Sequence, residues 1–431
     1  MRKLVQWLLG GDLDRNGWYL CLEIFWASIY GTAISFNAAL AIRLGATNAQ
    51  ISWLTSGQAL MALLLVPLVG RFLQGRSKRR PWMLLSLLLY RGSSLLLIFI
   101  PMLPGSFISP GLLVVLVILA AAVPVQVFNV GFNPFLTEAV AVKDRATVFA
   151  ARNVLGGVAG AVFSVVFGWL LVTLPFPLNY QVMLAAGLVF ALLSQYHLSR
   201  VQVTETELAP TPTAAAPKPS LRERWTGFVA GLRAAPEFVQ FSVNTFIHAF
   251  GMWMAGPLYT LYLLRELKIG ENWLGVMAAV GSVVSIVGYI IWRRIIARWG
   301  EPKTLKVTML LLGTYPLILG LSGWLPLILF AAVVHALISS GVNIVHLNTF
   351  LRVTPPEKRH AYNALNMTFM NAGIMVAPFI AVALANRFGL GPVLVGCGAA
   401  AILGATSFVL WPVGDPPPRP ALAADATAAG N

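Results

Sequence analysis

The chain has 431 residues, of which 58% are hydrophobic and only 10% are charged, and its mean hydropathy is +0.77. Soluble domains contain about 25% charged residues, so this composition excludes an ordinary soluble domain and indicates an integral membrane protein. A formal net charge of +15 would suggest nucleic-acid binding in a soluble protein. In a membrane protein basic loops explain such a charge, and we expect no nucleic-acid partner.

Apolar stretches of about 20 residues, long enough to cross the roughly 30 Å hydrocarbon core of a bilayer, recur along the chain. They lack the alternation of a membrane β-barrel, so we expect helices. The predicted spans are residues 18–42, 51–70, 82–103, 111–138, 148–174, 180–198, 238–264, 273–292, 305–324, 326–351, 361–386 and 392–411. The predicted fold class is an all-α integral membrane protein with 12 transmembrane helices.

Basic residues follow the parity of the loops. The N-terminus and the loops after even-numbered spans are rich in arginine and lysine, whereas the loops after odd-numbered spans carry little beyond Arg43, Arg265, Lys268 and Arg387. Basic loops stay on the cytoplasmic side of a membrane, which is also the more anionic one. We therefore expect a multi-pass protein of the plasma or inner membrane with both termini in the cytoplasm.

A linker separates two halves of the predicted fold. It begins with QVTETELAPTPTAAAPKPS, which is too rich in Pro, Thr and Ala to pack a core. It continues with LRERWTGFVAGLR, whose apolar residues at helical spacing predict an amphipathic surface helix. We expect an N-terminal six-helix bundle at 1–201, a cytoplasmic linker at 202–236, a C-terminal six-helix bundle at 237–412 and a disordered tail at 413–431.

The two halves look like copies of each other. NPFLTEAVAVKDRAT (133–147) aligns with NTFLRVTPPEKRHAY (348–362) at a constant offset of 215, and five residues match. Parallel six-span repeats imply two bundles related by an axis normal to the membrane, with a site between them at mid-depth.

Six plus six helices with these loops resemble the major facilitator superfamily of secondary transporters. The loop GRFLQGRSKRR after the second span is similar to the family motif that latches the two halves on the cytoplasmic side. TPPEKRHAYNALNMTFMNAG after the tenth span resembles the family's Pro-x-Glu-x-Arg signature. The resemblance implies a cytoplasmic gate with the candidates Gly70, Gln74, Lys78, Arg79, Glu357 and Arg359.

This sequence also departs from the family pattern. Gln74 stands where the motif has an aspartate, Ser77 replaces its second glycine, and Ala297 stands at the acidic position of the second half. We therefore expect the charge latch to be absent or built otherwise. The fifth span lacks the Gly-Pro-containing motif of drug and proton antiporters, which disfavours a standard drug exporter.

Polar residues at helical spacing form stripes on four spans. The resemblance implies that spans one, four, seven and ten line a central cavity. The alternative is that such residues form hydrogen bonds between helices that only hold the bundle together. We favour cavity lining, in which a small-molecule substrate contacts Tyr30, Asn37, Gln126, Asn129, Asn133, Asn244, His248, His335, Asn343 and His346.

Carboxylates within the spans are scarce, with only Glu23 and Glu138. A proton-coupled carrier needs a group that takes and gives up a proton as access alternates, and Glu23 is the best candidate. The histidines of the stripes are alternatives, because imidazole titrates near neutral pH. Glu138 is expected to pair with Arg145 or Arg152 as a structural or gating tie.

Arg91 interrupts the apolar stretch LLSLLLYRGSSLLLIFI of the third span. A charged side chain at the centre of a bilayer costs about 2.5 to 3.5 kcal/mol on insertion scales, so Arg91 needs a protein partner. Counting at about 1.5 Å per residue from Trp82 and Trp18 places Arg91 about 13 Å deep and Glu23 about 7 Å deep on the same side. We predict a buried Glu23–Arg91 ion pair, either permanent or broken during transport.

The expected function is secondary active transport of a small organic solute by alternating access, with protons as a candidate coupling ion. The alternatives are a polytopic membrane enzyme, or a lipid scramblase or sensor on a transporter-like fold. Neither a nucleotide-binding loop nor clustered acids of the Asp-x-x-Asp or His-Glu-x-x-His kind occur in the spans, so we expect no enzymatic activity.

Cys21 and Cys397 lie in apolar spans, which predicts buried thiols without a disulfide or a metal site. We expect no cofactor and no metal. The expected partners are the substrate, protons and membrane lipids, and the expected oligomeric state is a monomer.

Overall fold

The computed structural model describes residues 13–74, 76, 78–103, 108–203, 232–355, 357 and 359–413, and all of its regular structure there is helical. The N-terminal half contains α2 (Arg15–Ser35), α3 (Asn37–Arg43), α4 (Asn48–Gln74), α5 (Arg80–Phe99), η1 (Ile100–Met102), α6 (Pro110–Ala139), α7 (Arg145–Thr173) and α8 (Leu178–Arg200). The C-terminal half contains α10 (Pro236–Leu261), η2 (Tyr262–Glu266), α11 (Glu271–Trp299), α12 (Glu301–Leu312), α13 (Thr314–Leu321), α14 (Leu325–Val353), α15 (Arg359–Phe388), α16 (Leu390–Ala405) and α17 (Ser407–Leu410).

Eleven helical segments of the described residues are long and apolar enough to cross a membrane, and each coincides with a predicted span. The predicted seventh span, 238–264, forms α10, which is not among the eleven because polar residues such as Asn244 and His248 lower its hydropathy. At 26 residues α10 is about 39 Å long, and it packs against α15 and α16 within its bundle. Its length and packing support a twelfth span.

Helix ends follow local sequence signals. The Asp14 carboxylate accepts a hydrogen bond from the Gly17 amide (2.6 Å) at the start of α2, and Ser109 caps α6 in the same way. Gly300 separates α11 from α12 and has a φ of +77°, a conformation that glycine adopts without strain. The predicted eighth span ended at residue 292, where Arg293 and Arg294 end the apolar stretch, but the helix α11 itself continues to Trp299.

The repeat detected in the sequence corresponds to equivalent helices. α14 begins 215 residues after α6, and α15 begins 214 residues after α7. Most of the predicted linker (204–231), including its amphipathic helix, and all but the first residue of the predicted tail (414–431) lie outside the described residues.

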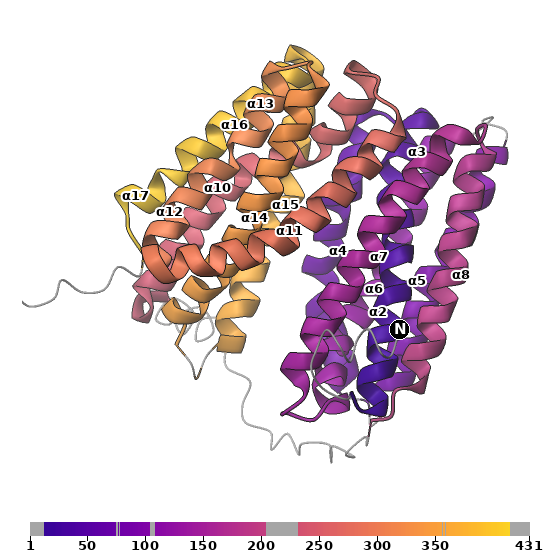
Figure 1. The fold of residues 1–431 in the computed structure, drawn as a ribbon, viewed down its shortest axis with the longest axis horizontal. Coiled ribbons are helices and arrows are strands. Elements are labelled where there is room, and N and C mark those ends of the chain that lie inside the picture. The colour runs from indigo at the N-terminus through magenta and orange to yellow at the C-terminus, as the bar shows by residue number, and fades with distance from the viewer. Residues whose placement is uncertain are drawn as a thin grey trace, which may run out of the picture.

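The two halves contact each other through α7 against α11 and α4 against α15 (Figure 1). Glycine permits the first contact: a Cβ on Gly275 would lie 2.2 Å from the Ser164 carbonyl oxygen, and one on Gly168 would lie 3.1 Å from the Asn272 Cα. Small residues at a helix crossing allow two backbones to approach closely.

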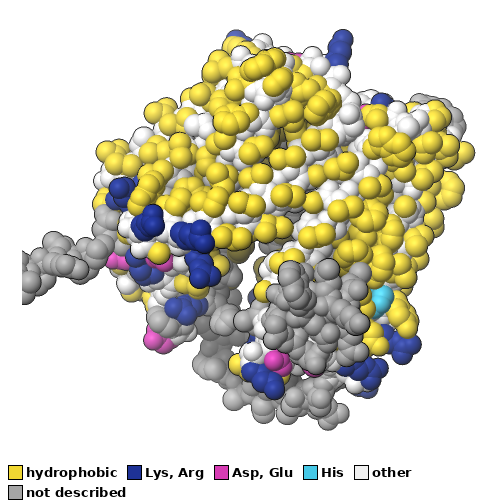
Figure 2. All heavy atoms as spheres, in the orientation of Figure 1, with side chains coloured by type: hydrophobic (Ala, Val, Ile, Leu, Met, Phe, Trp, Pro, Cys, Tyr) yellow, Lys and Arg dark blue, Asp and Glu magenta, His cyan; other side chains and the backbone are white. Residues whose placement is uncertain are grey.

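The molecule has two different ends. The terminal end contains the start of α2, the end of α8, the start of α10 and α17, whereas the opposite end contains Arg43, Asn48 and Glu271. The halves meet toward the opposite end, here called the closed end, and diverge toward the terminal end (Figure 1). Figure 2 shows an apolar surface over both halves, with arginine and lysine side chains gathered mainly at the terminal end.

Candidate functional site

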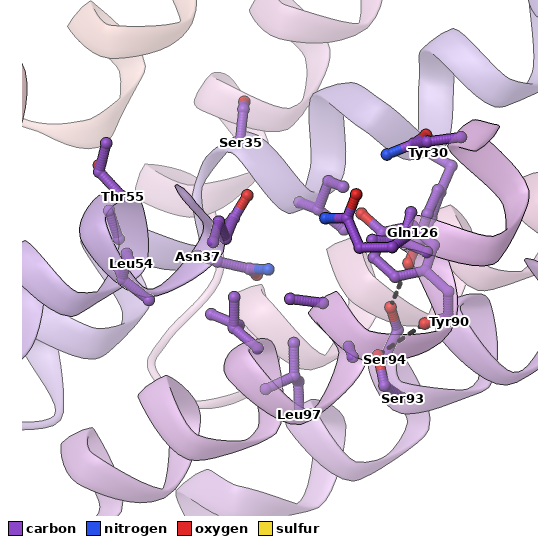
Figure 3. Close-up of a pocket in the computed structure, with 18 residues that line it drawn as sticks. Tyr30, Ser35, Asn37, Leu54, Thr55, Tyr90, Ser93, Ser94, Leu97 and Gln126 are labelled. Atoms are coloured by element: carbon purple, nitrogen blue, oxygen red, sulfur yellow. Dashed lines mark hydrogen bonds between the residues drawn. The ribbon is translucent and has the colours of Figure 1, made fainter. Parts of the chain in front are cut away.

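A cavity of about 470 Å³ lies within the N-terminal half, between α2, α3, α4, α5 and α6 (Figure 3). Hydroxyl and amide groups dominate its polar lining, and among the described residues that line it there is no acid, lysine, arginine or histidine. The polar lining residues are Tyr30, Ser35, Asn37, Thr55, Gln58, Tyr90, Ser93, Ser94, Gln126 and Asn129.

A break in the first predicted span shapes this cavity. α2 ends at Ser35 and α3 begins at Asn37, with Phe36 between them outside helical geometry. Ser35 and Asn37 therefore reach the cavity from either side of the break. The Tyr30 hydroxyl is held by the Ser94 hydroxyl at 2.9 Å.

A second cavity, of about 370 Å³, lies in the C-terminal half between α10, α12, α14 and α15. His248, Asn343 and His346 line it, together with apolar residues. His248 Nδ1 lies 2.9 Å from the Ala401 carbonyl oxygen. A carbonyl oxygen only accepts, so Nδ1 is protonated and donates a hydrogen bond to it. His346 Nε2 lies 3.1 Å from the Thr245 hydroxyl.

The structure brings seven of the ten predicted substrate residues to these two cavities. The other three are Asn133, Asn244 and His335, which line neither of them. Asn133 is exposed, and Asn244 is fully buried and donates to the Trp411 carbonyl at 3.0 Å. The His335 ring packs on Tyr315 of α13 with centroids 4.7 Å apart.

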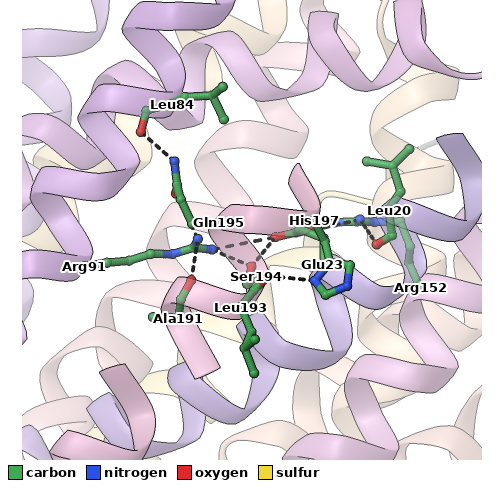
Figure 4. A network of polar contacts seen from close by, with 10 residues as sticks. All are labelled: Leu20, Glu23, Leu84, Arg91, Arg152, Ala191, Leu193, Ser194, Gln195 and His197. Atoms are coloured by element: carbon green, nitrogen blue, oxygen red, sulfur yellow. Dashed lines mark hydrogen bonds and ion pairs between the residues drawn. The ribbon is translucent and has the colours of Figure 1, made fainter. Parts of the chain in front are cut away.

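A buried ionic network lies inside the N-terminal half (Figure 4). Glu23 is 3% exposed, and its closest cationic partner is Arg152 of α7, with Nη1 and Oε2 2.9 Å apart. Arg91 lies 3.8 Å from the other carboxylate oxygen and is bridged to it by Ser194, which donates to Glu23 at 3.1 Å and accepts from Arg91 at 2.7 Å. The predicted Glu23–Arg91 contact exists, but Arg152 forms the shorter one.

This network connects four helices of one half. Arg91 also donates to the Ala191 carbonyl and to Gln195, both on α8, and Arg152 donates to the Leu20 carbonyl of α2. Two arginines and one glutamate leave one net positive charge, distributed over several carbonyl and hydroxyl dipoles. Every described partner in this network belongs to the N-terminal half.

At the closed end, an ion pair joins the two halves. Arg43, the last residue of α3, lies with Nε 3.0 Å from Glu271 Oε1, at the start of α11. Glu271 is 5% exposed and also accepts from the Tyr180 hydroxyl at 3.2 Å. The helix N-terminus adds a favourable field for its negative charge.

A second contact at the closed end runs in the opposite direction. Arg265, at the end of η2, donates to the Asn48 side chain and to the Ala46 carbonyl of the N-terminal half. Asn48 in turn donates to Asn386 of α15 at 2.9 Å. The two contacts are therefore equivalent. Arg43 ends the first span of the N-terminal half and binds the start of α11, and Arg265 ends the first span of the C-terminal half and binds the start of α4.

Sequence reasoning did not identify this pair of contacts. The feature of the sequence that could have indicated these contacts is that the loops after odd-numbered spans contain few charged residues, and that Arg43 and Arg265 are two of them. Glu271 lies at the edge of the predicted eighth span, and nothing in its sequence neighbourhood indicates that its partner lies 228 residues earlier.

The motif loop after α4 is fastened without an acidic residue on the loop. The Arg76 guanidinium lies 4.8 Å from the ring centroids of both Phe72 and Trp82, and Arg80 donates to the Ser199 carbonyl of α8. Of the gate candidates there, Gly70 belongs to α4, Lys78 is exposed and Arg79 is half-buried. The Gln74 side chain lies outside the described part of the structure.

The remaining gate candidates lie at the terminal end of the helices. Glu138 is exposed, and the cations proposed for it bind elsewhere: Arg152 contacts Glu23, and Arg145 donates to the Thr137 and Val140 carbonyls. Glu357 is exposed, and Arg359 donates to the Leu351 carbonyl at 3.3 Å.

In the C-terminal half an acid does serve the motif loop. Glu301, which directly follows Gly300, accepts from Asn348 at 2.9 Å and lies 3.6 Å from Arg352, both on α14. An acid that contacts α14 is therefore present four residues after Ala297.

Within the described residues, no group of three or more histidine, cysteine, aspartate or glutamate side chains could hold a metal ion. Cys21 and Cys397 are both buried free thiols.

The family model described as Major Facilitator Superfamily matches residues 19–235 and 241–429. No curated protein matches the sequence. Among solved structures, the chain is similar to a bacterial homologue of the iron transporter ferroportin in an inward-facing state (TM-score 0.72, 13% identity, covering 93% of this chain and 99% of that chain). It is also similar to a mutant of the nucleoside transporter NupG (0.70, 9%, 91% and 99%) and to a D-xylose-proton symporter (0.66, 13%, 96% and 98%). At these identities the likeness concerns the fold.

Proposed function

This chain belongs to the Major Facilitator Superfamily and is a secondary transporter, and we propose that its small organic solute binds in the cavity between α2 and α6 of the N-terminal half. The observation that carries this proposal is the composition of that cavity. It is large enough for a small molecule and presents ten polar side chains to one cavity within the helices. Polar groups within a membrane are costly, so a site is the best explanation for so many of them in one place.

The proposal includes an orientation. Arginine and lysine side chains gather mainly at the terminal end, and basic segments stay in the cytoplasm (Figure 2). We place the terminal end in the cytoplasm of a plasma or inner membrane, so the closed end faces outward. Hydrogen bonds and ion pairs between described residues of the two halves cluster at that closed end, which makes this an inward-facing conformation.

The proposal also includes proton coupling. Glu23 lies inside one half and lines neither cavity, so rocking of the two halves leaves its surroundings unchanged. Glu271 lies at the contact between the halves, and its distance from Arg43 must increase when the closed end opens. A carboxylate whose surroundings change with access is what coupling requires, so we propose Glu271 as the coupling group.

Solute flux into proteoliposomes, with and without an imposed pH gradient, tests this function. We expect saturable flux of a small solute that an inward proton gradient changes, and we expect Glu271→Gln to remove the effect of the gradient while Glu23→Gln, compared at equal folded protein, retains it. Absence of flux for every solute tested would exclude transport. Flux that is insensitive to the gradient would exclude the coupling step alone.

A further inference from the structure

The cavity of the N-terminal half has a chemistry that selects among solutes. We propose that it binds a neutral solute bearing several hydroxyl groups, such as a pentose or a nucleoside, through the amide and hydroxyl side chains of α2 to α6. This inference rests on the proposed transport function and names its substrate class.

The absence of charge from the lining disfavours ionic solutes. Tyr90 lines the cavity, but its neighbour Arg91 turns the other way and donates to Ala191 and Ser194 of α8. Glu23 is enclosed by Arg152 and Ser194 and does not reach the cavity. An anionic or cationic solute would therefore be buried without a countercharge, which is unfavourable.

Four amides match the bonding pattern of hydroxyl groups. Asn37, Gln58, Gln126 and Asn129 each carry a carbonyl acceptor beside an NH₂ donor. A hydroxyl group both donates and accepts, so one amide can pair with two neighbouring hydroxyls of a solute. Apolar residues such as Leu54, with the Tyr30 ring, complete the lining and suit the C–H faces of a ring.

Gln126 is the residue on which recognition depends most. Its side chain is buried, with an exposed fraction of 7%, and its amide forms no hydrogen bond with another described residue. Figure 3 shows this amide among the cavity-lining side chains, with no bond drawn to it. Side-chain amides inside proteins are normally paired. The nitrogen and oxygen of the Gln126 amide remain accessible from the cavity, so a solute can reach them. A solute hydroxyl supplies the missing partner.

Tyr30, unlike Gln126, already has a hydrogen-bond partner in the protein. Its hydroxyl is already bonded to Ser94, so it shapes the cavity wall and has less free capacity for a solute. We therefore expect a substitution of Gln126 to weaken solute binding strongly and a substitution of Tyr30 to weaken it only slightly.

Ligand-dependent thermal stabilisation of the full chain in detergent tests this inference, because only a bound solute shifts stability. The neutral probes are uridine and D-xylose. Uridine is compared with 2′,3′-dideoxyuridine, which lacks the 2′ and 3′ hydroxyls, and with the anion uridine 5′-monophosphate. D-xylose is compared with D-xylonate, an open-chain anion. Tetraphenylphosphonium represents lipophilic cations. We expect stabilisation by at least one of the two neutral probes and binding about tenfold weaker for its altered analogue.

Variants then assign the effect to the cavity. Gln126→Met conserves length without polar atoms and should weaken binding of the neutral probe about tenfold, whereas Tyr30→Phe should weaken it less than threefold. Gln240→Met, in the other half, is the matched control and should bind as the parent does. If Gln126→Met does not fold, Asn129→Leu replaces it, with binding again expected to weaken.

Stabilisation by the anions or by tetraphenylphosphonium but by neither neutral probe would overturn the inference, as would unchanged binding in Gln126→Met. Transport of other solutes without binding of these probes would refute the substrate class and leave the function standing. Binding of these probes without flux of any solute would support the substrate class and refute the transport function.

Discussion

Arg43 and Glu271 form an ion pair across the two halves of the molecule, with 3.0 Å between Nε and Oε1. Glu271 is buried and is also bound by Tyr180, whereas the Arg43 side chain is 41% exposed. Arg265 binds Asn48 and the Ala46 carbonyl in the opposite direction. Both contacts must separate before the closed end can open. We therefore expect the strength of these two contacts to determine how often the closed end opens.

Removing the first contact should favour opening. We expect Arg43→Gln to increase access to the cavity from the closed end about two- to fivefold, the range for an ion pair with one exposed partner. The measurement is the labelling rate of Ser35→Cys, a cavity residue, by an impermeant thiol reagent added on that side. The natural cysteines, Cys21 and Cys397, are buried.

Glu266→Gln is the matched control for this prediction, because Glu266 lies at the same end but accepts from Leu390 within its own half. The exchanged pair Arg43→Glu with Glu271→Arg should restore slow labelling. Equal labelling of Arg43→Gln and the parent would show that the pair does not hold the end closed.

The second contact should act independently of the first. Arg265→Gln should raise the labelling rate on its own, and combining it with Arg43→Gln should multiply the two effects, because the two arginines bind different partners. Arg387→Gln is the control, since Arg387 contacts the Phe388 ring on its own helix. A double variant no faster than the faster single variant would mean that one contact already controls opening.

The α7–α11 crossing should not tolerate a side chain at Gly275. The added Cβ of Gly275→Ala would lie 2.2 Å from the Ser164 backbone oxygen, so the two helices must move apart. We expect a lower melting temperature and faster labelling from the closed end. Gly256→Ala, whose Cβ meets no atom within 4 Å, should change neither. An unaltered melting temperature in Gly275→Ala would contradict the close crossing.

The Glu23 network should stabilise the bundle rather than take part in transport. Arg152→Gln removes the closest cation from Glu23 but leaves Arg91 and Ser194 beside the carboxylate, so it should cost about 1.5 to 3 kcal/mol of unfolding free energy, the range for hydrogen bonds to charged groups. Arg91→Gln should also destabilise, since it removes hydrogen bonds to α8. Thermal unfolding measures both, with the exposed Arg200→Gln as control.

Flux per folded molecule decides the functional side of this prediction. It should be unchanged in Arg91→Gln, because the network lies within one half and is carried as a unit when the halves rock. Loss of flux at normal stability would instead mean that the Glu23–Arg91 contact breaks during transport.

Much of the fold follows from local sequence patterns. The positions of the spans and the division into six plus six depend on apolar length, on turn residues and on a repeat, which are properties of neighbouring residues. Depth along a helix is also local: the rise per residue placed Arg91 within reach of Glu23, and the two are 3.8 Å apart.

Partner choice is different, because it depends on how each helix is rotated and on which helix lies beside it. Arg152 becomes the closest cation to Glu23 only because α7 packs along α2. Asn244 binds the Trp411 carbonyl and lies outside the cavity that contains His248, because of the rotation of α10. The spacing of polar residues along one helix shows that they share a face of that helix, but it does not show which neighbouring helix or cavity that face meets.

Sequence patterns alone predict a membrane protein of two six-helix halves, because burial in lipid demands long apolar helices whatever their arrangement. Which polar groups share a cavity, which arginine lies closest to Glu23, and how Arg43 and Arg265 each reach the other half depend on the tertiary structure. These contacts join residues that are distant in the chain, so they arise from packing between helices rather than from the pattern within any one of them.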